Sequence, residues 1–444
     1  MLLHNIWIAW KSLRRSPVLS GLIIACIAIG IAFATTFAAV RHAFTRHPLP
    51  DKEASLRYVR LDNWDPREPY PGGAADALPP QITYRDAMAL RRSTVPVRQT
   101  ASFRARLTVF PEPSVGRPTK EDVRLAHADF FQMFDVPFRY GSGWTRESDE
   151  KLDQVVVISE ALNERVFGGR NSVGQTLRIE TRDFRVVGVL AGWLPSVRVY
   201  DMTGNALSEP EPVYLPFGLV VPMELRTVGN SDGWGGRGGS PTASFAARLA
   251  SGESTWVQYW VELPSPADEQ AYRSLIESYI AEQRRLGRFG RPTNYRVSSI
   301  GTLMDDFQVA PKETFALLMV GLLFLVVAAV NLIGLLLGKF LARANEVGVR
   351  RGRGAERGEV FLPHLVECQV VAVLGGAIGL GLAALSLRSL NAFMLDTTSR
   401  GDLFRLDLQM LLLALALSVA AGLISGIYPA WRICRLAPAS HLKV

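Results

Sequence analysis

Four long stretches that contain no Asp, Glu, Lys or Arg constrain this 444-residue chain more than any other feature. They cover residues 16–40, 314–338, 368–387 and 408–431. A helix of about 20 apolar residues crosses the roughly 30 Å hydrocarbon core of a bilayer. We therefore predict four transmembrane helices at these positions, because a soluble fold seldom buries four such helices together.

The charged residues are distributed unevenly, and their positions predict the topology. Residues 1–15 carry a net charge of +3, residues 339–367 carry +2 and residues 432–444 carry +3, which together account for the whole formal net charge of +8. The segments 41–313 and 388–407 are each neutral. Because cytoplasmic loops of membrane proteins hold the excess of Lys and Arg, we place both termini and the 339–367 loop in the cytoplasm. The same distribution argues against a nucleic-acid-binding protein.

The first 40 residues admit more than one interpretation. Apolar residues recur at helical spacing in residues 1–15, which predicts an amphipathic helix on the cytoplasmic membrane surface. A simple extension of the first span is the alternative for that segment. The first run also resembles a cleavable signal peptide, because Ala32-Phe33-Ala34 has the form of a cleavage site. The run continues uncharged to Val40, which favours a permanent anchor.

Residues 41–313 lie between the first two runs and predict one large extracytoplasmic domain, with 388–407 as a short extracytoplasmic loop. Alternating polarity and β-branched runs predict strands, and two segments have helical periodicity. The predicted strands are 56–61, 103–110, 155–158, 176–179, 184–190 and 256–263, and the predicted helices are 160–167 and 267–285. The predicted fold class is a membrane protein with four transmembrane α-helices and a large α+β extracytoplasmic domain between the first and second helices.

No arrangement of residues in the sequence predicts catalysis. Cys26 and Cys368 lie in predicted spans and Cys434 lies in the tail, so we expect no disulfide within the exported domain. Residues 169–176 follow the phosphate-loop pattern G-x-x-x-x-G-K-[ST], except that Gln175 replaces the Lys that contacts phosphates. We interpret this segment as a Gly-rich turn. The prediction is a chain that is not an enzyme and holds neither a metal nor a cofactor of its own.

Small and polar residues within the runs predict contacts between helices. Gly375 and Gly379 in the third run, and Gly422 and Gly426 in the fourth, have the four-residue spacing that lets helices approach closely. We expect Asn331 in the second run to form an interhelical hydrogen bond. None of the runs contains an Asp, Glu, Lys or Arg, which argues against a proton- or ion-coupled transporter.

The loop between the second and third runs contains the most informative motif, N-E-V-G-V-R-R-G-R-G-A-E-R at residues 345–357. This motif is short, basic and bounded by two predicted spans, so it is suited to dock on an acidic cytoplasmic surface. The alternative is an ordinary positive loop that contacts lipid headgroups. The residue types alone leave both interpretations open.

This motif resembles the coupling helix of the permease subunits of MacB/FtsX-type ABC transporters, which reads roughly E-[IV]-G-[VI]-R-[RK]-A-L-G-A-[ST]. The matching residues are Glu346, Val347, Gly348, Val349, Arg350, Arg351, Gly354 and Ala355. Gly352, Arg353 and Glu356 depart from the motif, and Arg353 replaces a usual Leu. Further segments resemble the family, and they occur in the same order along the chain as in the family. They lie at 129–131 and 173–176 in the exported domain and at 425–431 in the last run.

The resemblance implies a permease subunit with a MacB-like periplasmic core domain, located in the bacterial inner membrane. It implies mechanotransmission, in which ATP hydrolysis drives a conformational change outside the membrane and exports a substrate. ATP and Mg²⁺ are expected on a separate ABC ATPase subunit, because this chain has no Walker motif. Further expected partners are a second permease chain, identical or different, membrane lipid, and a periplasmic adaptor or an outer-membrane channel. The alternatives are an FtsX-like signalling scaffold that controls a periplasmic partner, and a lipoprotein-releasing permease.

Overall fold

The computed structural model describes residues 17–71, 76–111, 116–234, 243–341, 357–398 and 403–434, together with Trp7, Lys11, Leu13 and Arg14. For residues 357–360, 396–398, 433 and 434 it describes the backbone only.

The chain divides into two compact units. Residues 1–46 and 310–444 form the first, which we call the membrane unit, and residues 47–309 form the second, which we call the inserted unit. Most of the amphipathic helix predicted at 1–15 lies outside the described residues, as does 435–444 in the tail.

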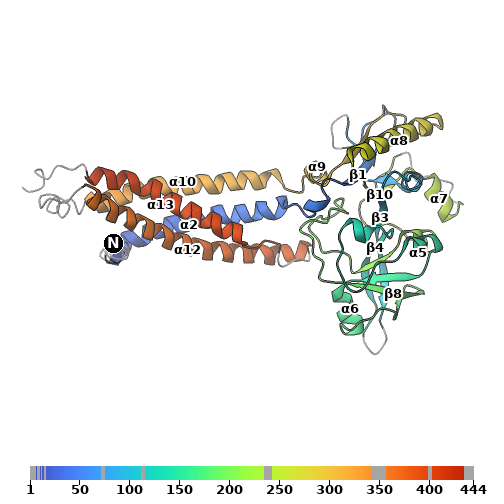
Figure 1. The fold of residues 1–444 in the computed structure, drawn as a ribbon, viewed down its shortest axis with the longest axis horizontal. Coiled ribbons are helices and arrows are strands. Elements are labelled where there is room, and N and C mark those ends of the chain that lie inside the picture. Colours follow the sequence, from blue (N-terminus) through green and yellow to red (C-terminus); the bar gives the residue numbers. More distant parts are fainter. Residues whose placement is uncertain are drawn as a thin grey trace, which may run out of the picture. The chain divides into compact units, whose positions relative to one another are not determined.

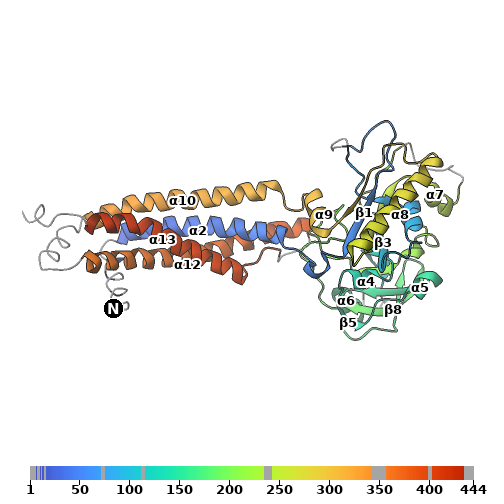
Figure 2. The ribbon, with the colours of Figure 1, turned by 45° about the horizontal axis from the view of Figure 1, so that its top comes forward.

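Four long helices run side by side in the membrane unit (Figure 1 and Figure 2). They are α2 (Pro17–Thr45), α10 (Lys312–Leu341), α12 (Arg357–Thr398) and α13 (Leu408–Cys434). All four are long and apolar enough to cross a membrane, and the described residues contain no further helix of this kind. This confirms the predicted four apolar helices. Each helix also extends past an end of its uncharged run, since charged side chains near a membrane surface reach into the polar headgroup region.

α2 is the inner helix of the membrane unit, while α10 lies more to the outside. Half of the most apolar window of α2 (50%) is buried, against 28% for α10. Ile23, Ile27 and Ile31 recur at helical spacing on α2 and belong to a core that residues of α10, α12 and α13 complete. α10 therefore turns much of its apolar surface away from the rest of its own unit.

The inserted unit is built around a mixed β-sheet. Its described strands follow the order β11-β1-β10-β3-β4-β9-β6-β8-β5, with β2 on β10 and β7 on β3 and β8. The β4–β9 and β6–β8 pairs are parallel, and the other pairs are antiparallel. The bounds are β1 Leu56–Leu61, β2 Ile82–Thr83, β3 Arg98–Phe110, β4 Thr119–Ala126, β5 Phe138–Gly141, β6 Val155–Ile158, β7 Thr176–Ile179, β8 Arg182–Leu190, β9 Val213–Pro216, β10 Thr255–Glu262 and β11 Tyr295–Ser298.

Short helices connect these strands, and one longer helix, α8 (Pro266–Arg285), packs on the sheet. Ser265 and Asp268 form a reciprocal capping box at its start, which satisfies backbone N–H groups that the helix itself leaves unpaired. The other helices are α3 Tyr84–Leu90, α4 Phe130–Met133, α5 Arg146–Lys151, α6 Glu160–Phe167, α7 Phe245–Ser251 and α9 Ile300–Asp306, with single 3-10 turns η1 at Pro50–Lys52 and η2 at Phe217–Val220.

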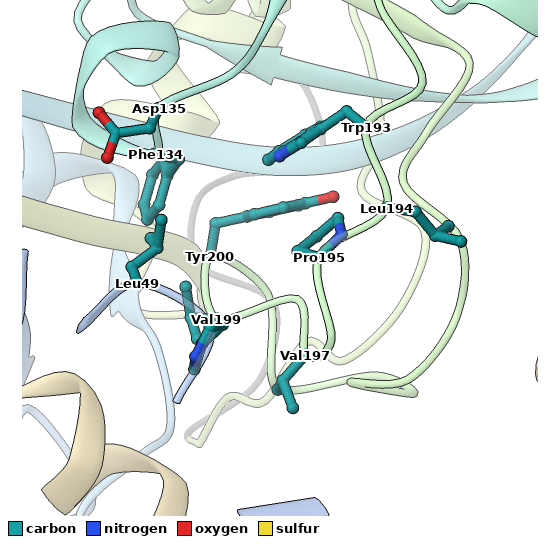
Figure 3. A pocket seen from close by; sticks show the side chains of 10 residues that line it. Leu49, Phe134, Asp135, Trp193, Leu194, Pro195, Val197, Val199 and Tyr200 are labelled. Carbon is teal, nitrogen blue, oxygen red and sulfur yellow. The ribbon is translucent and has the colours of Figure 1, made fainter. Parts of the chain in front are cut away.

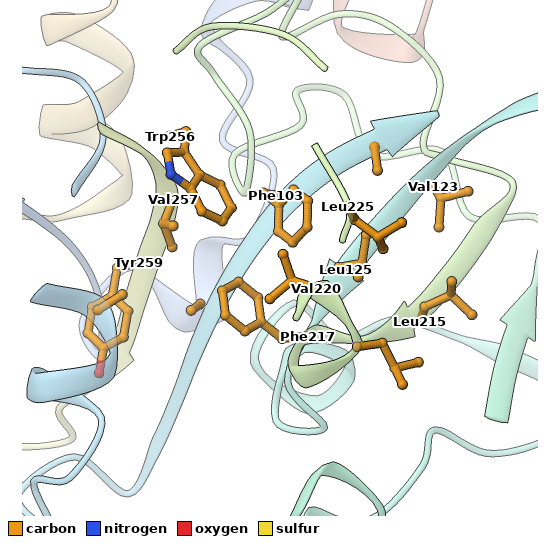
Figure 4. Packing of buried hydrophobic residues seen from close by; sticks show 14 of the residues in the cluster. Phe103, Val123, Leu125, Leu215, Phe217, Val220, Leu225, Trp256, Val257 and Tyr259 are labelled. Atoms are coloured by element: carbon orange, nitrogen blue, oxygen red, sulfur yellow. The ribbon is translucent and has the colours of Figure 1, made fainter. Parts of the chain in front are cut away.

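Both faces of the sheet are buried under separate hydrophobic cores. In β6, Val156 and Ile158 belong to one core, while Val155 and Val157 belong to the other. This alternation follows from the two-residue period of a strand. Figure 4 shows part of the first core, where the ring of Phe103 on β3 meets that of Trp256 on β10 edge to face, with centroids 4.8 Å apart.

The strands and helices predicted in this unit are confirmed, with small shifts at their ends. The bounds of α6 could be predicted because a capping residue marks each of its ends. The Ser159 hydroxyl accepts a hydrogen bond from the Leu162 N–H at the start, and Gly168 adopts a left-handed conformation (φ +66°) at the end. The Gly-rich segment that follows is a turn into β7. The buried Ser172 hydroxyl donates to the side chain of Asn163 at 2.6 Å, so the turn is tied back to α6.

Candidate coupling site and helix contacts

The predicted coupling residues lie outside the described residues. These are Glu346, Val347, Gly348, Val349, Arg350, Arg351, Gly354 and Ala355. The helices on either side of them are described, since α10 ends at Leu341 and α12 begins at Arg357. The geometry that bears on coupling is therefore that of the two helix ends.

A buried ion pair joins the last turn of α10 to a point further along α12, past its first turns. The Lys339 ammonium on α10 lies 2.8 Å from a carboxylate oxygen of Glu367 on α12. The same ammonium donates a hydrogen bond of 3.1 Å to the hydroxyl of Ser20 on α2. The side chains of Lys339 and Glu367 are only 3% and 6% exposed. Three helices thus meet at one polar cluster.

The physical cost of burying these charges makes the cluster informative. An isolated charge loses several kcal/mol of hydration when it is buried, and a partner in direct contact offsets that loss. Removing either partner leaves the other buried and unpaired. Lys339 and Glu367 therefore act as a matched pair that opposes separation of α10 from α12.

The predicted packing glycines of α12 lie against α2. A Cβ atom added at Gly379 would lie 2.6 Å from the carbonyl oxygen of Ala28, and one added at Gly375 would lie 2.8 Å from Ile27. Real Cβ atoms do not approach backbone oxygens so closely. The backbones of α2 and α12 are thus as near to each other as glycine permits.

The predicted glycines of α13 lie against α12 in the same way. A Cβ added at Gly422 would lie 2.7 Å from Ala372, and one added at Gly426 would lie 2.8 Å from Cys368. Ser418 reinforces this contact, because its hydroxyl donates to the carbonyl oxygen of Ala372 at 2.6 Å. The buried Ser418 hydroxyl therefore ties the two helices together.

Asn331 lies elsewhere, on the exposed side of α10. Among the described residues its side chain has no hydrogen-bond partner, so the interhelical bond expected of Asn331 stays a prediction. Gly334 and Gly338 are also exposed, and a Cβ added at either would meet no atom within 4 Å. These three residues recur at helical spacing, so Asn331, Gly334 and Gly338 form one face, which we call the Asn331 face.

Sequence reasoning missed Lys339 and Glu367 as functional residues. Both were assigned to the ends of the loop, because the uncharged runs stop one residue away from each. The available signal was their opposite charge at the two run ends that border the same loop. The described residues contain no group of His, Cys, Asp and Glu that could hold a metal ion.

Two protein-family models match the chain. The MacB-like periplasmic core domain matches residues 20–279, which is more than half of the chain, and the FtsX-like permease C-terminal domain matches residues 318–438. The two matches follow each other along the chain.

Curated relatives carry the name "Macrolide export ATP-binding/permease protein MacB". The protein from Escherichia coli (strain K12) is 24% identical over 443 residues, which is 98% of this chain and 59% of the relative. The protein from Syntrophobacter fumaroxidans is 24% identical over 351 residues, which is 71% of this chain and 46% of the relative. The chain thus spans about half of the length of the relatives it matches.

Solved structures of similar domains show low overall agreement. The periplasmic region of MacB from Actinobacillus actinomycetemcomitans is 14% identical, with a TM-score of 0.35, over 59% of this chain and 95% of that one. The extracellular domain of the transporter YknZ from Gram-positive bacteria is 13% identical, with a TM-score of 0.33, over 55% of this chain and all of that one.

Proposed function

Because this chain belongs to the MacB/FtsX-type family of ABC permeases and carries a MacB-like periplasmic core domain, we propose that it is the permease subunit of an export complex driven by a separate ATPase. ATP and Mg²⁺ bind to that ATPase, which docks on the motif that begins at Glu346. Both termini and the loop 339–367 lie in the cytoplasm of a bacterium, and the inserted unit lies outside the inner membrane. The substrate is released outside the membrane by movement of that unit.

The observation that carries the proposal is the Lys339–Glu367 pair. A force applied to the loop 342–356 reaches α10 and α12 together, because a buried ion pair links Lys339 near the end of α10 to Glu367 within α12. The bond from Lys339 to Ser20 extends the same link to α2. α2 and α10 are the helices that enter and leave the inserted unit along the chain. Movement of the loop therefore acts on both connections to that unit.

The Asn331 face supports a second permease chain as partner. An amide in the middle of an apolar helix loses hydrogen bonds when lipid surrounds it. Two Asn side chains can satisfy each other across a two-fold axis, since each carries a donor and an acceptor. Gly334 and Gly338 would allow the two backbones to approach, as in other small-residue helix pairs. We therefore place the dimer contact of the complex on this face of α10.

The coupling assignment is tested by the double variant Glu346→Ala with Arg350→Ala, expressed with the cognate ATPase. We expect the ATPase to copurify poorly and its stimulation by the permease to be lost. The matched control is Arg353→Ala with Glu356→Ala, which removes the same pair of charges from positions that depart from the family motif. Normal assembly and stimulation of the first variant would show that the loop is not the coupling element.

A further inference from the structure

The chain enters and leaves the inserted unit through neighbouring strands. Residues 47–53, which we call the incoming segment, follow α2 along the chain and lead into β1. β11 leads into α9, which we call the outgoing helix and which precedes α10. β1 and β11 are antiparallel neighbours, with Tyr58 opposite Ser298. The two connections of the unit therefore start from the same part of the sheet.

Both connections pack into one hydrophobic core. Ile300, Leu303 and Met304 of the outgoing helix are buried in it, and Leu49 of the incoming segment packs against it. Figure 3 shows Leu49 beside Phe134, which belongs to the same core. Apolar packing is not directional, so it does not by itself fix how the outgoing helix is aligned with the incoming segment.

The carboxylate of Glu53 supplies a directional contact between the two. It accepts a hydrogen bond of 2.7 Å from the Ser299 hydroxyl and one of 3.2 Å from the Gly301 N–H. Ser299 is the N-cap of the outgoing helix. A Cβ added at Gly301 would lie 3.1 Å from a carboxylate oxygen of Glu53, so the glycine leaves room for this contact. One side chain of the incoming segment thus holds the start of the outgoing helix.

His47 supports Glu53 from within the incoming segment. Its Nδ1 accepts a hydrogen bond of 3.3 Å from the Leu49 N–H, which places the ring proton on Nε2. Nε2 then donates to Glu53 at 2.7 Å. Burial raises the pKa of the Glu53 carboxyl, but the hydrogen bonds from Ser299 and His47 hold this pKa below its usual value. Glu53 is therefore ionised at neutral pH, which strengthens the hydrogen bonds that it accepts.

The other end of the outgoing helix is held to β1. Arg60 on β1, which is only 6% exposed, forms an ion pair with Asp306, the last residue of α9. Its guanidinium also lies over the ring of Phe307, 5.7 Å from the centroid. The outgoing helix is thus fixed at both ends to the part of the chain that enters the unit. A shift of α9 relative to β1 would break the contact of Glu53, that of Arg60, or both.

We propose that Glu53 is a positioning residue that fastens the outgoing helix to the incoming segment, so that both connections of the inserted unit move together. A displacement that arrives along either connection then reaches β1, which is bonded to β10 and β11 in the sheet. The sheet is displaced as one body, and α9 does not separate from it. This consequence for coupling rests on the proposed function, whereas the fastening itself requires no ATPase.

The variant Ser299→Asp tests the fastening. Asp caps a helix as well as Ser does, so the outgoing helix keeps its cap, but a second carboxylate beside Glu53 replaces the hydroxyl donor. Hydrogen exchange is measured on the full chain in nanodiscs, with single amides resolved by mass spectrometry. We expect the amides of Gly301 and Leu49 to exchange about tenfold faster. The Leu49 amide is the decisive one, because damage confined to the outgoing helix would not reach it.

A second substitution should restore the contact. Glu53→Gln combined with Ser299→Asp places an amide donor beside the new carboxylate, and both exchange rates should return to within about threefold of the original chain. A merely local disturbance of the helix would not be reversed in this way. The control Ser244→Asp makes the same change at the N-cap of α7, which also has seven residues, and should alter neither rate.

Glu53→Gln alone provides an independent test if Ser299→Asp does not fold, which its thermal unfolding temperature reports. One acceptor oxygen remains but the charge is lost, so the Gly301 amide should exchange about threefold faster. An unchanged Gly301 rate in this variant would overturn the proposal. So would an unchanged Leu49 rate in Ser299→Asp, or equal rates in the single Ser299→Asp and the double variant. No ATPase is present, so these outcomes are separate from those of the coupling test.

Discussion

The ammonium group of Lys339 on α10 and the carboxylate of Glu367 on α12 lie 2.8 Å apart, buried between the two helices that flank the basic loop. Each residue is the first charged group beyond an apolar run, one at the end of the second run and one before the third. The pair therefore connects the two helices that flank this loop within the interior of the helix bundle.

Breaking this pair should destabilise the membrane unit. Lys339→Met leaves the Glu367 carboxylate buried without a cation, which costs about 3–5 kcal/mol in comparable buried pairs. We expect a clear loss of thermal stability for the full chain in detergent. The double variant Lys339→Met with Glu367→Leu removes both charges and should recover most of the lost thermal stability. Equal losses in the single and double variants would show that the two side chains do not act as a pair.

The α2–α12 contact should not tolerate a single added methyl group at Gly379. The new Cβ would lie 2.6 Å from the Ala28 carbonyl oxygen, so the helices must separate. Overpacking of this kind costs about 1–3 kcal/mol. Gly381→Ala, on the same helix with no atom within 4 Å, is the matched control and should be neutral or slightly stabilising, since Ala favours helices. Unfolding temperatures of the two variants in detergent decide between these expectations.

The Asn331 face should govern association of two permease chains. Asn331→Leu removes an interchain hydrogen bond worth about 1–2 kcal/mol in membrane helices, which corresponds to roughly a 5- to 30-fold weaker dimer. Gly334→Leu should act more strongly by blocking the approach of the backbones. Gly21→Leu on α2, where an added Cβ also meets no atom within 4 Å, serves as the control. Single-molecule photobleaching in liposomes measures the dimer fraction, and an unchanged fraction in both α10 variants would place the dimer contact elsewhere.

Arg124 should be essential to the fold of the inserted unit. Arg124→Met removes the Arg124 cation from Asp201 and from Glu211, although Glu211 keeps its contact with Arg198. We expect the free energy of unfolding to fall by about 3–5 kcal/mol. Arg139→Met removes an exposed partner of Glu160 and should have little effect. Urea unfolding followed by tryptophan fluorescence compares the two. A small effect of Arg124→Met would mean that water or Arg198 compensates for the lost charge.

Asp149 should make the inserted unit more stable in mild acid. Burial raises the pKa of its carboxyl to about 6, although it accepts hydrogen bonds from the Ala128 N–H and the Trp144 indole. In the unfolded chain the pKa is about 3.8. The folded state therefore binds the proton more tightly, and the stability gained from protonation is lost as the pH rises through about 6.

The size of this pH effect is measurable. Between pH 7.5 and pH 5 the group should contribute about 1 kcal/mol of added stability. Asp149→Asn should lack this contribution, whereas Asp183→Asn, which changes an exposed carboxylate, should retain it. Urea unfolding at the two pH values provides the comparison. Identical pH slopes for the Asp149→Asn variant and the original chain would rule out Asp149 as the source.

Local patterns predicted much of the secondary structure in this chain. The strand at 155–158 was readable from its β-branched residues, and α6 was readable because Gly168 ends it with a left-handed conformation. The buried residues of the inserted unit were harder to predict from local sequence patterns. Arg124 is fully buried against Asp201 and Glu211, which lie far from it in sequence, and no local pattern distinguishes it from an exposed arginine.

The candidate site residues were likewise only partly predictable from the sequence. The glycines at 375, 379, 422 and 426 could be named from their spacing, but which helix each one meets depends on the fold. Asn331 was expected to form an interhelical hydrogen bond, and in the structure it lies on the exposed side of α10. The orientation of Asn331 depends on which face of α10 packs on α2. Because α10 is apolar on all sides, its sequence does not indicate that face.

The four apolar helices, the position of the inserted unit between the first two and the family resemblance of the loop motif could all be predicted from the amino-acid sequence, because hydrophobic length and charge position act locally. The contact between Lys339 and Glu367, the outward position of Asn331 and the burial of Arg124 against two carboxylates became visible only in the folded chain. Contacts of this kind join residues distant in sequence or depend on how helices pack. They are selected by the free energy of the whole fold and not by the pattern of any one segment.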